Sequence, residues 1–205
     1  MKRIFFALAF MASPAAAQNL AETLMQPGLL AQMPRENLPC YAHRRQAQPA
    51  DEGMNAPDNV QDEKVCLVRS ADQGREHLEL SLTDAGQARV VAQFPLETSN
   101  PILLFFLENV VRVVATHTGG SPYYVRNRLR EALIAGQQVP DGGTAQVVMH
   151  PFDNDPNRDR LGDFADIAVT LRYDPADPVR LLQLSADTGD GDSGYTETMT
   201  LLPEE

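Results

Sequence analysis

The chain has 205 residues, enough for one domain with a substantial hydrophobic core, and its 28 acidic residues outnumber 17 basic ones for a net charge of −11. Such a charge repels the phosphates of DNA and RNA and anionic membrane surfaces, so neither partner is expected. A membrane span is not expected either, because the apolar runs are too short or are interrupted by charges.

The N-terminal segment has the features of a secretory signal peptide. Lys2 and Arg3 precede an apolar run, which is followed by small residues ending at Ala17. The pattern predicts export and cleavage after Ala17. Residues 18–205 are then expected to form a single globular domain.

The next segment, residues 19–33, is expected to form a short helix. Asn19 and Glu22 have the spacing of a capping box, and Pro27 with Gly28 interrupts the pattern.

The chain has two cysteines, Cys40 and Cys66. In an exported protein two cysteines usually pair, which predicts a disulfide that closes a polar loop over 40–66. A soft-metal site formed by Cys40, His43 and Cys66 is the alternative, but it lacks a fourth ligand.

Strand-like alternation of apolar and polar residues occurs in about seven segments. The clearest is 77–83, where Leu78, Leu80 and Leu82 share one face. In the last segment Glu197 shares its face with Tyr195 and Met199. The segments are 65–69, 77–83, 89–94, 144–150, 166–173, 179–185 and 195–202.

Between these two groups of strands lies a pair of helices. Asn100-Pro101 and Ser121-Pro122 each combine a capping residue with proline at the first helical position, and Gly119 separates the two helical patterns. Strands, a helical hairpin and further strands predict an α+β fold with a mostly antiparallel sheet and the hairpin packed on it.

Two acidic stretches invite a metal interpretation. In 153–163 the EF-hand positions that require glycine and glutamate hold Arg158 and Phe164, so a turn capped at Asp155-Pro156 is favoured. The glycine-rich stretch 187–197 is the better calcium candidate. Its ligands would be Asp187, Asp190, Asp192 and Glu197, although a solvated turn explains the same residues.

A weak anion site is suggested where the second helix begins. Gly120 and Ser121 precede free backbone N–H groups, and Arg126 and Arg130 follow. Arginines on the wet face of a helix are the alternative. A serine hydrolase is disfavoured, because Pro122 has no N–H to donate to an oxyanion.

The run NPILLFFLENVVRVVATHTGGSPYYVRNRLREAL, followed by Asp155-Pro156, Arg158 and Arg160, resembles a segment of small uncharacterised exported proteins of Gram-negative bacteria. The resemblance covers about residues 100–173, implies a periplasmic location and carries no activity.

The sequence thus favours a non-catalytic periplasmic protein that binds an unidentified protein or small molecule and serves envelope maintenance. No cofactor is expected apart from calcium under the second hypothesis, a calcium-dependent binding module. A hydrolase with dispersed carboxylates is the third.

Overall fold

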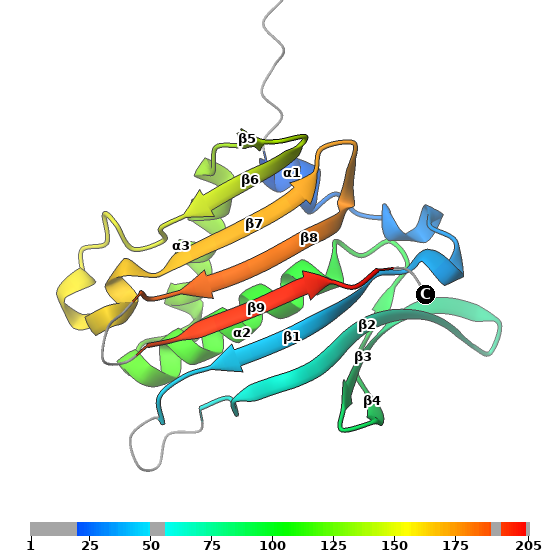
Figure 1. The fold of residues 1–205 in the computed structure, drawn as a ribbon, viewed down its shortest axis with the longest axis horizontal. Coiled ribbons are helices and arrows are strands. Elements are labelled where there is room, and N and C mark those ends of the chain that lie inside the picture. Colours follow the sequence, from blue (N-terminus) through cyan, green and yellow to red (C-terminus); the bar gives the residue numbers. More distant parts are fainter. Residues whose placement is uncertain (1–19, 50–55, 190–193, 204–205) are drawn as a thin grey trace, which may run out of the picture.

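The structure is a computed structural model that describes residues 20–49, 56–189 and 194–203. The predicted signal peptide over 1–17 and Asn19 lie outside these ranges. Within them, nine strands form one sheet in the order β4-β3-β2-β1-β9-β8-β7-β6-β5, and every neighbouring pair is antiparallel (Figure 1). The strands are β1 Cys40–Gln46, β2 Val60–Asp72, β3 Arg75–Asp84, β4 Gln87–Pro95, β5 Val139–Asp141, β6 Thr144–Met149, β7 Ala168–Asp174, β8 Asp177–Asp187 and β9 Thr196–Leu201.

The predicted α+β class with a large antiparallel sheet is confirmed, but the sheet has nine described strands where about seven were expected. The two additional strands are β1 and β5. Strand β1 was not predicted, because two of its inward-facing positions carry His43 and Arg45 in place of apolar residues. Its sequence therefore lacks the alternation of apolar and polar residues that indicates a strand. Strand β5 is three exposed residues long and has no apolar face.

Three α-helices are described: α1 Leu20–Leu24, α2 Pro101–Thr118 and α3 Pro122–Ala135. The helix expected over 19–33 is shorter than predicted. It ends at Leu24, and Pro27 and Gly28 separate it from a 3-10 turn at Leu30–Gln32.

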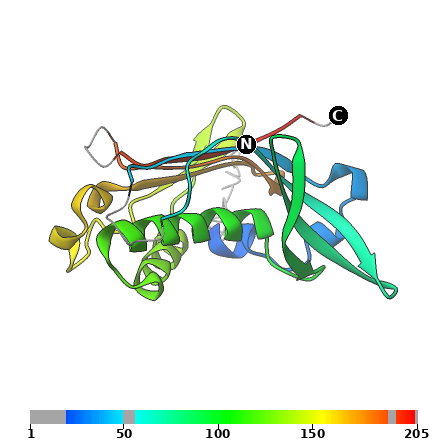
Figure 2. The same ribbon diagram turned by 90° about the horizontal axis from the view of Figure 1, so that it is seen from below.

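The predicted helical hairpin is present and begins as expected. The Asn100 Oδ1 atom accepts hydrogen bonds from the backbone N–H groups of Ile102 (3.1 Å) and Leu103 (3.3 Å). Gly119, with φ of +62°, ends α2 in the left-handed conformation that glycine adopts without strain. The hairpin lies against one face of the sheet and connects the β4 edge to the β5 edge (Figure 2).

Helix α2 is the central element of the core. It is long and apolar enough to cross a membrane by length and composition, and more than half of it is buried in the fold. Its inward face includes Ile102, Phe106, Val110 and Val113, all at most 1% exposed. Figure 2 shows the β3–β4 end of the sheet bending toward the helix layer, which places these strands beside α2.

The stretch 153–163 forms a capped turn, as the sequence predicts. The Asp155 carboxylate accepts the backbone N–H of Asn157 at 2.7 Å and the Tyr124 hydroxyl at 2.6 Å. It also pairs with Arg128 of α3 at 2.7 Å, which holds the loop against that helix. The turns that follow, at Arg158–Arg160 and Gly162–Asp166, are 3-10 turns.

The predicted disulfide is present between Cys40 and Cys66, which lie directly opposite each other on β1 and β2. The expectation that 40–66 is a polar loop is wrong at both ends, because residues 40–46 and 60–66 are paired strands. Such a bond is typical of oxidising compartments and fits export.

Removal of this bond should destabilise the protein. The disulfide joins residues 26 positions apart, so reduction or the double change Cys40→Ser with Cys66→Ser should lower the free energy of unfolding by about 3 kcal/mol. Urea titrations with and without reductant measure the loss. The double variant is the control, because its stability should not respond to reductant.

Candidate functional site

A cluster of polar and charged side chains lies between the sheet and α2, where apolar contacts would be expected. Each member is at most 9% exposed. The members come from β1, β2, α2, β9 and the residue before β9, and are His43, Arg45, Glu63, Asn109, Tyr195 and Glu197.

His43 is at the centre of this buried cluster. Its Nδ1 atom lies 2.8 Å from Glu63 Oε2 and its Nε2 atom lies 2.8 Å from Glu197 Oε1. A neutral imidazole has one N–H and one lone pair, so it could satisfy only one of two ionised carboxylates. Both contacts are satisfied together when His43 is an imidazolium that donates from both nitrogens.

Glu197 has a partner for each of its carboxylate oxygens. Besides His43, Oε1 accepts a hydrogen bond from Asn109 Nδ2 at 3.0 Å and lies 3.7 Å from Arg45 Nη1. The Tyr195 hydroxyl donates to Oε2 at 2.7 Å. With two cations and two carboxylates, the buried cluster has no net charge, which reduces the cost of removing these ions from water.

The surroundings shift two pKa values in this cluster. Burial is the largest influence on His43 and by itself lowers its pKa, but the hydrogen bonds to Glu197 and Glu63 outweigh it, so the net pKa is raised. Burial, together with the charge of Glu197, raises the pKa of Tyr195 well above its ordinary value. The phenol therefore stays neutral and donates its hydrogen.

The buried cluster holds α2 against the sheet. Asn109 of α2 reaches Glu197 of β9, and the ring of Phe105 meets His43 edge-on, with 5.9 Å between ring centroids. Both α2 residues also line a groove beside the helix. The cluster thus fixes the position of one wall of that groove.

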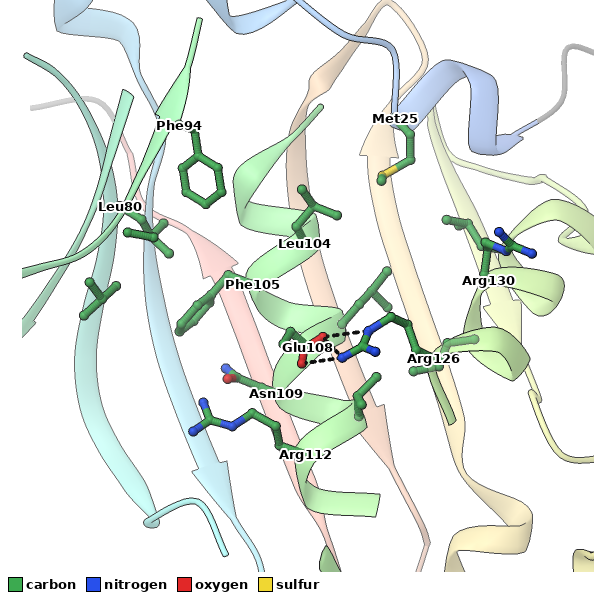
Figure 3. A pocket seen from close by; sticks show the side chains of 16 residues that line it. Met25, Leu80, Phe94, Leu104, Phe105, Glu108, Asn109, Arg112, Arg126 and Arg130 are labelled. Carbon is green, nitrogen blue, oxygen red and sulfur yellow. Dashed lines mark hydrogen bonds and ion pairs between the residues drawn. The ribbon is translucent and has the colours of Figure 1, made fainter. Parts of the chain in front are cut away.

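The groove has a volume of about 580 Å³ and runs along α2, with β3 and β4 on one side and α3 on the other (Figure 3). Its lining is mainly apolar. The apolar residues are Met25, Leu80, Val91, Ala92, Phe94, Leu104, Phe105, Leu107, Val111, Leu129 and Leu133.

Charged side chains also line this groove. Arg126 donates three hydrogen bonds to Glu108, from Nη2 to Oε1 at 2.8 Å and to Oε2 at 3.0 Å, and from Nε to Oε2 at 3.2 Å. This ion pair neutralises both groups. Arg112 and Arg130 are exposed, and neither has a hydrogen bond or ion pair with any residue that the structure describes.

The structure brings together half of the predicted anion site. Arg126 and Arg130 line the groove, whereas Gly120 and Ser121 lie where α3 begins and are not among its lining residues. The Ser121 side chain makes no capping hydrogen bond. The arrangement therefore differs from a site built on free N–H groups.

The predicted calcium ligands are only partly described. Asp187 ends β8 and accepts the backbone N–H of Gly189, while Asp190 and Asp192 lie outside the described residues. Glu197 points into the buried cluster. Within the described ranges no three Asp, Glu, His or Cys side chains are placed to hold a metal ion, and the calcium hypothesis stays a prediction.

Sequence reasoning missed the buried cluster and the groove. The available signal was charge on apolar strand faces: Glu197 stands between Tyr195 and Met199, and His43 and Arg45 follow Tyr41 at alternate positions. That signal does not show which charged side chains meet, because the strands that carry them are distant in sequence.

The raised pKa of His43 predicts a specific pH dependence of stability. Stability from a raised histidine pKa is complete below the unfolded value, about 6.5, and is lost as the pH rises through the folded value. The difference in free energy of unfolding between the wild type and His43→Asn should therefore shrink as the pH rises above 6.5. Urea titrations across this range measure it. His150→Asn, the same substitution at an exposed histidine outside the buried cluster, is the control.

Removal of one carboxylate should leave the buried cations unbalanced. Glu197→Gln keeps the side-chain size but leaves His43 and Arg45 facing a single carboxylate, so the free energy of unfolding should fall by about 3 kcal/mol at neutral pH. Thermal and urea unfolding test this. Glu97→Gln, at an exposed position, is the matched control. Equal stability of the two variants would contradict the proposed charge balance.

Comparison with known proteins does not assign the chain to a family: no family model matches it, and no curated protein is detectably similar to its sequence. The function is therefore inferred from the groove and the buried cluster.

Proposed function

We propose that this protein is a non-catalytic binding protein of the periplasm that holds an apolar ligand in the groove along α2. The observation that carries the proposal is the groove itself, whose volume of about 580 Å³ and mainly apolar lining are typical of small-molecule sites. A periplasmic protein of this kind would serve the upkeep of the cell envelope.

The buried cluster supports binding over catalysis. Its histidine and carboxylates are the groups that would perform acid–base chemistry, but His43 is 1% and Glu197 0% exposed. A general acid or base must come within hydrogen-bond reach of its substrate. Because these groups bond to one another beneath α2, their role is to hold the groove wall, and the hydrolase hypothesis has no accessible acid pair here.

A preformed groove favours affinity, because little conformational freedom is lost on binding. Helix α2 is anchored to the sheet by Asn109 and by the packing of Phe105 on His43. The ligand would therefore meet a wall that is already in place.

A substitution that fills the groove with a bulky side chain tests the proposal. The uncharged dye N-phenyl-1-naphthylamine should bind the purified protein with a rise in fluorescence. Ala92→Trp places an indole among the lining residues of β4 and should weaken dye binding at least about tenfold, because one bulky side chain would occupy the space of the dye.

Ala88→Trp is the matched control. Ala88 lies on the same strand but pairs with Thr83, so it faces away from the leucine face of β3 that borders the groove. This variant should bind the dye as the wild type does. Absence of dye binding by the wild type, or equal binding by both variants, would refute the proposal.

A further inference from the structure

We infer that the ligand is a single-chain carboxylate amphiphile, a long-chain fatty acid whose carboxylate pairs with Arg112. This inference rests on the proposed function, since it names the ligand class of the same groove. A site for such a ligand requires a cation that lies beside apolar surface and that no other group of the protein pairs with.

Arg112 lies beside the apolar surface of the groove, as a site for the carboxylate requires. Figure 3 shows its side chain on the same side of α2 as Leu80, Phe94 and Phe105, which line the part of the groove between α2 and the β3–β4 strands. A hydrocarbon chain lying over these three side chains would bring its end group to the guanidinium. The guanidinium offers two parallel N–H donors to a carboxylate.

Arg112 is also a cation without a partner among the described residues. Two other arginines on this side of the molecule are neutralised, since Arg126 pairs with Glu108, and Arg128 pairs with Asp155 and Glu131. Arg130 is unpaired among the described residues too, but it lines the α3 side of the groove, away from Leu80 and Phe94. Arg112 has no such partner in the part of the chain that the structure describes. An unpaired cation favours an anionic group of the ligand at that point.

The lining favours a hydrocarbon chain over a peptide. A peptide brings backbone N–H and C=O groups that need partners when they are buried. Apart from Arg112 and Arg130, the polar side chains that line the groove already have partners, because Asn109 donates to Glu197 and Glu108 accepts from Arg126. A fatty acid has one polar end, and that end would lie at the exposed guanidinium.

Displacement of the bound dye by two ligands of equal chain length tests the inference. Palmitate should displace N-phenyl-1-naphthylamine at about a fivefold lower concentration than hexadecanol, since an exposed ion pair contributes modestly. The preference should weaken at high salt. Arg112→Gln should abolish the preference while the affinity for hexadecanol stays unchanged.

Arg44→Gln is the control with the same loss of charge. Arg44 is exposed on β1 and alternates with the inward His43, so it lies on the opposite face of the sheet. It should keep the preference for palmitate. Equal displacement by palmitate and hexadecanol, or a preference lost through Arg130→Gln and kept by Arg112→Gln, would overturn the inference and leave the proposed function standing. Failure of the dye to bind at all would overturn both.

Discussion

The pair of hydrogen bonds that His43 makes to Glu63 and Glu197 is the interaction on which the arrangement of this protein depends. Ions removed from water cost several kcal/mol each unless partners surround them. Here two cations face two carboxylates, and Asn109 and Tyr195 supply further hydrogen bonds to Glu197. The cost is offset only when all the contributing elements are in place, so the cluster favours one arrangement of β1, β2, β9 and α2.

That constraint acts at the middle of the sheet. Strand β1, near the start of the described chain, pairs with β9, near its end, and joins two runs of sequential antiparallel strands. The disulfide between Cys40 and Cys66 fastens β1 to β2 beside the same region. The α2–α3 hairpin connects the outer edges of the two runs beneath the sheet, and the buried cluster holds α2 against the sheet (Figure 2).

The groove follows from this geometry. Because the β3–β4 end of the sheet bends toward the helix layer and α3 lies on the other side of α2, the outward side of α2 is bordered by apolar surface on both flanks (Figure 3). Phe105 and Asn109 each serve both regions, contacting the buried cluster and lining the groove. A ligand in the groove therefore meets a wall whose position is set by the buried charged cluster. Among the described residues, Arg112 is the unpaired cation on the side of α2 that faces Phe94 and Leu80.

Local chemistry was enough to determine the elements themselves. The cap at Asn100, the proline at 122, the glycine at 119 and the alternation of Leu78 with Leu80 act over a few neighbouring residues, so the helical hairpin, most strands and the α+β class could be predicted. The pairing of the two cysteines followed from composition. Only the tertiary structure decided that β1 is a central strand, that Glu197 faces His43 instead of a loop, and that Arg112 borders apolar side chains from β3 and β4. The physical reason is that these features depend on contacts between residues 20 to more than 150 positions apart, which a local pattern does not encode.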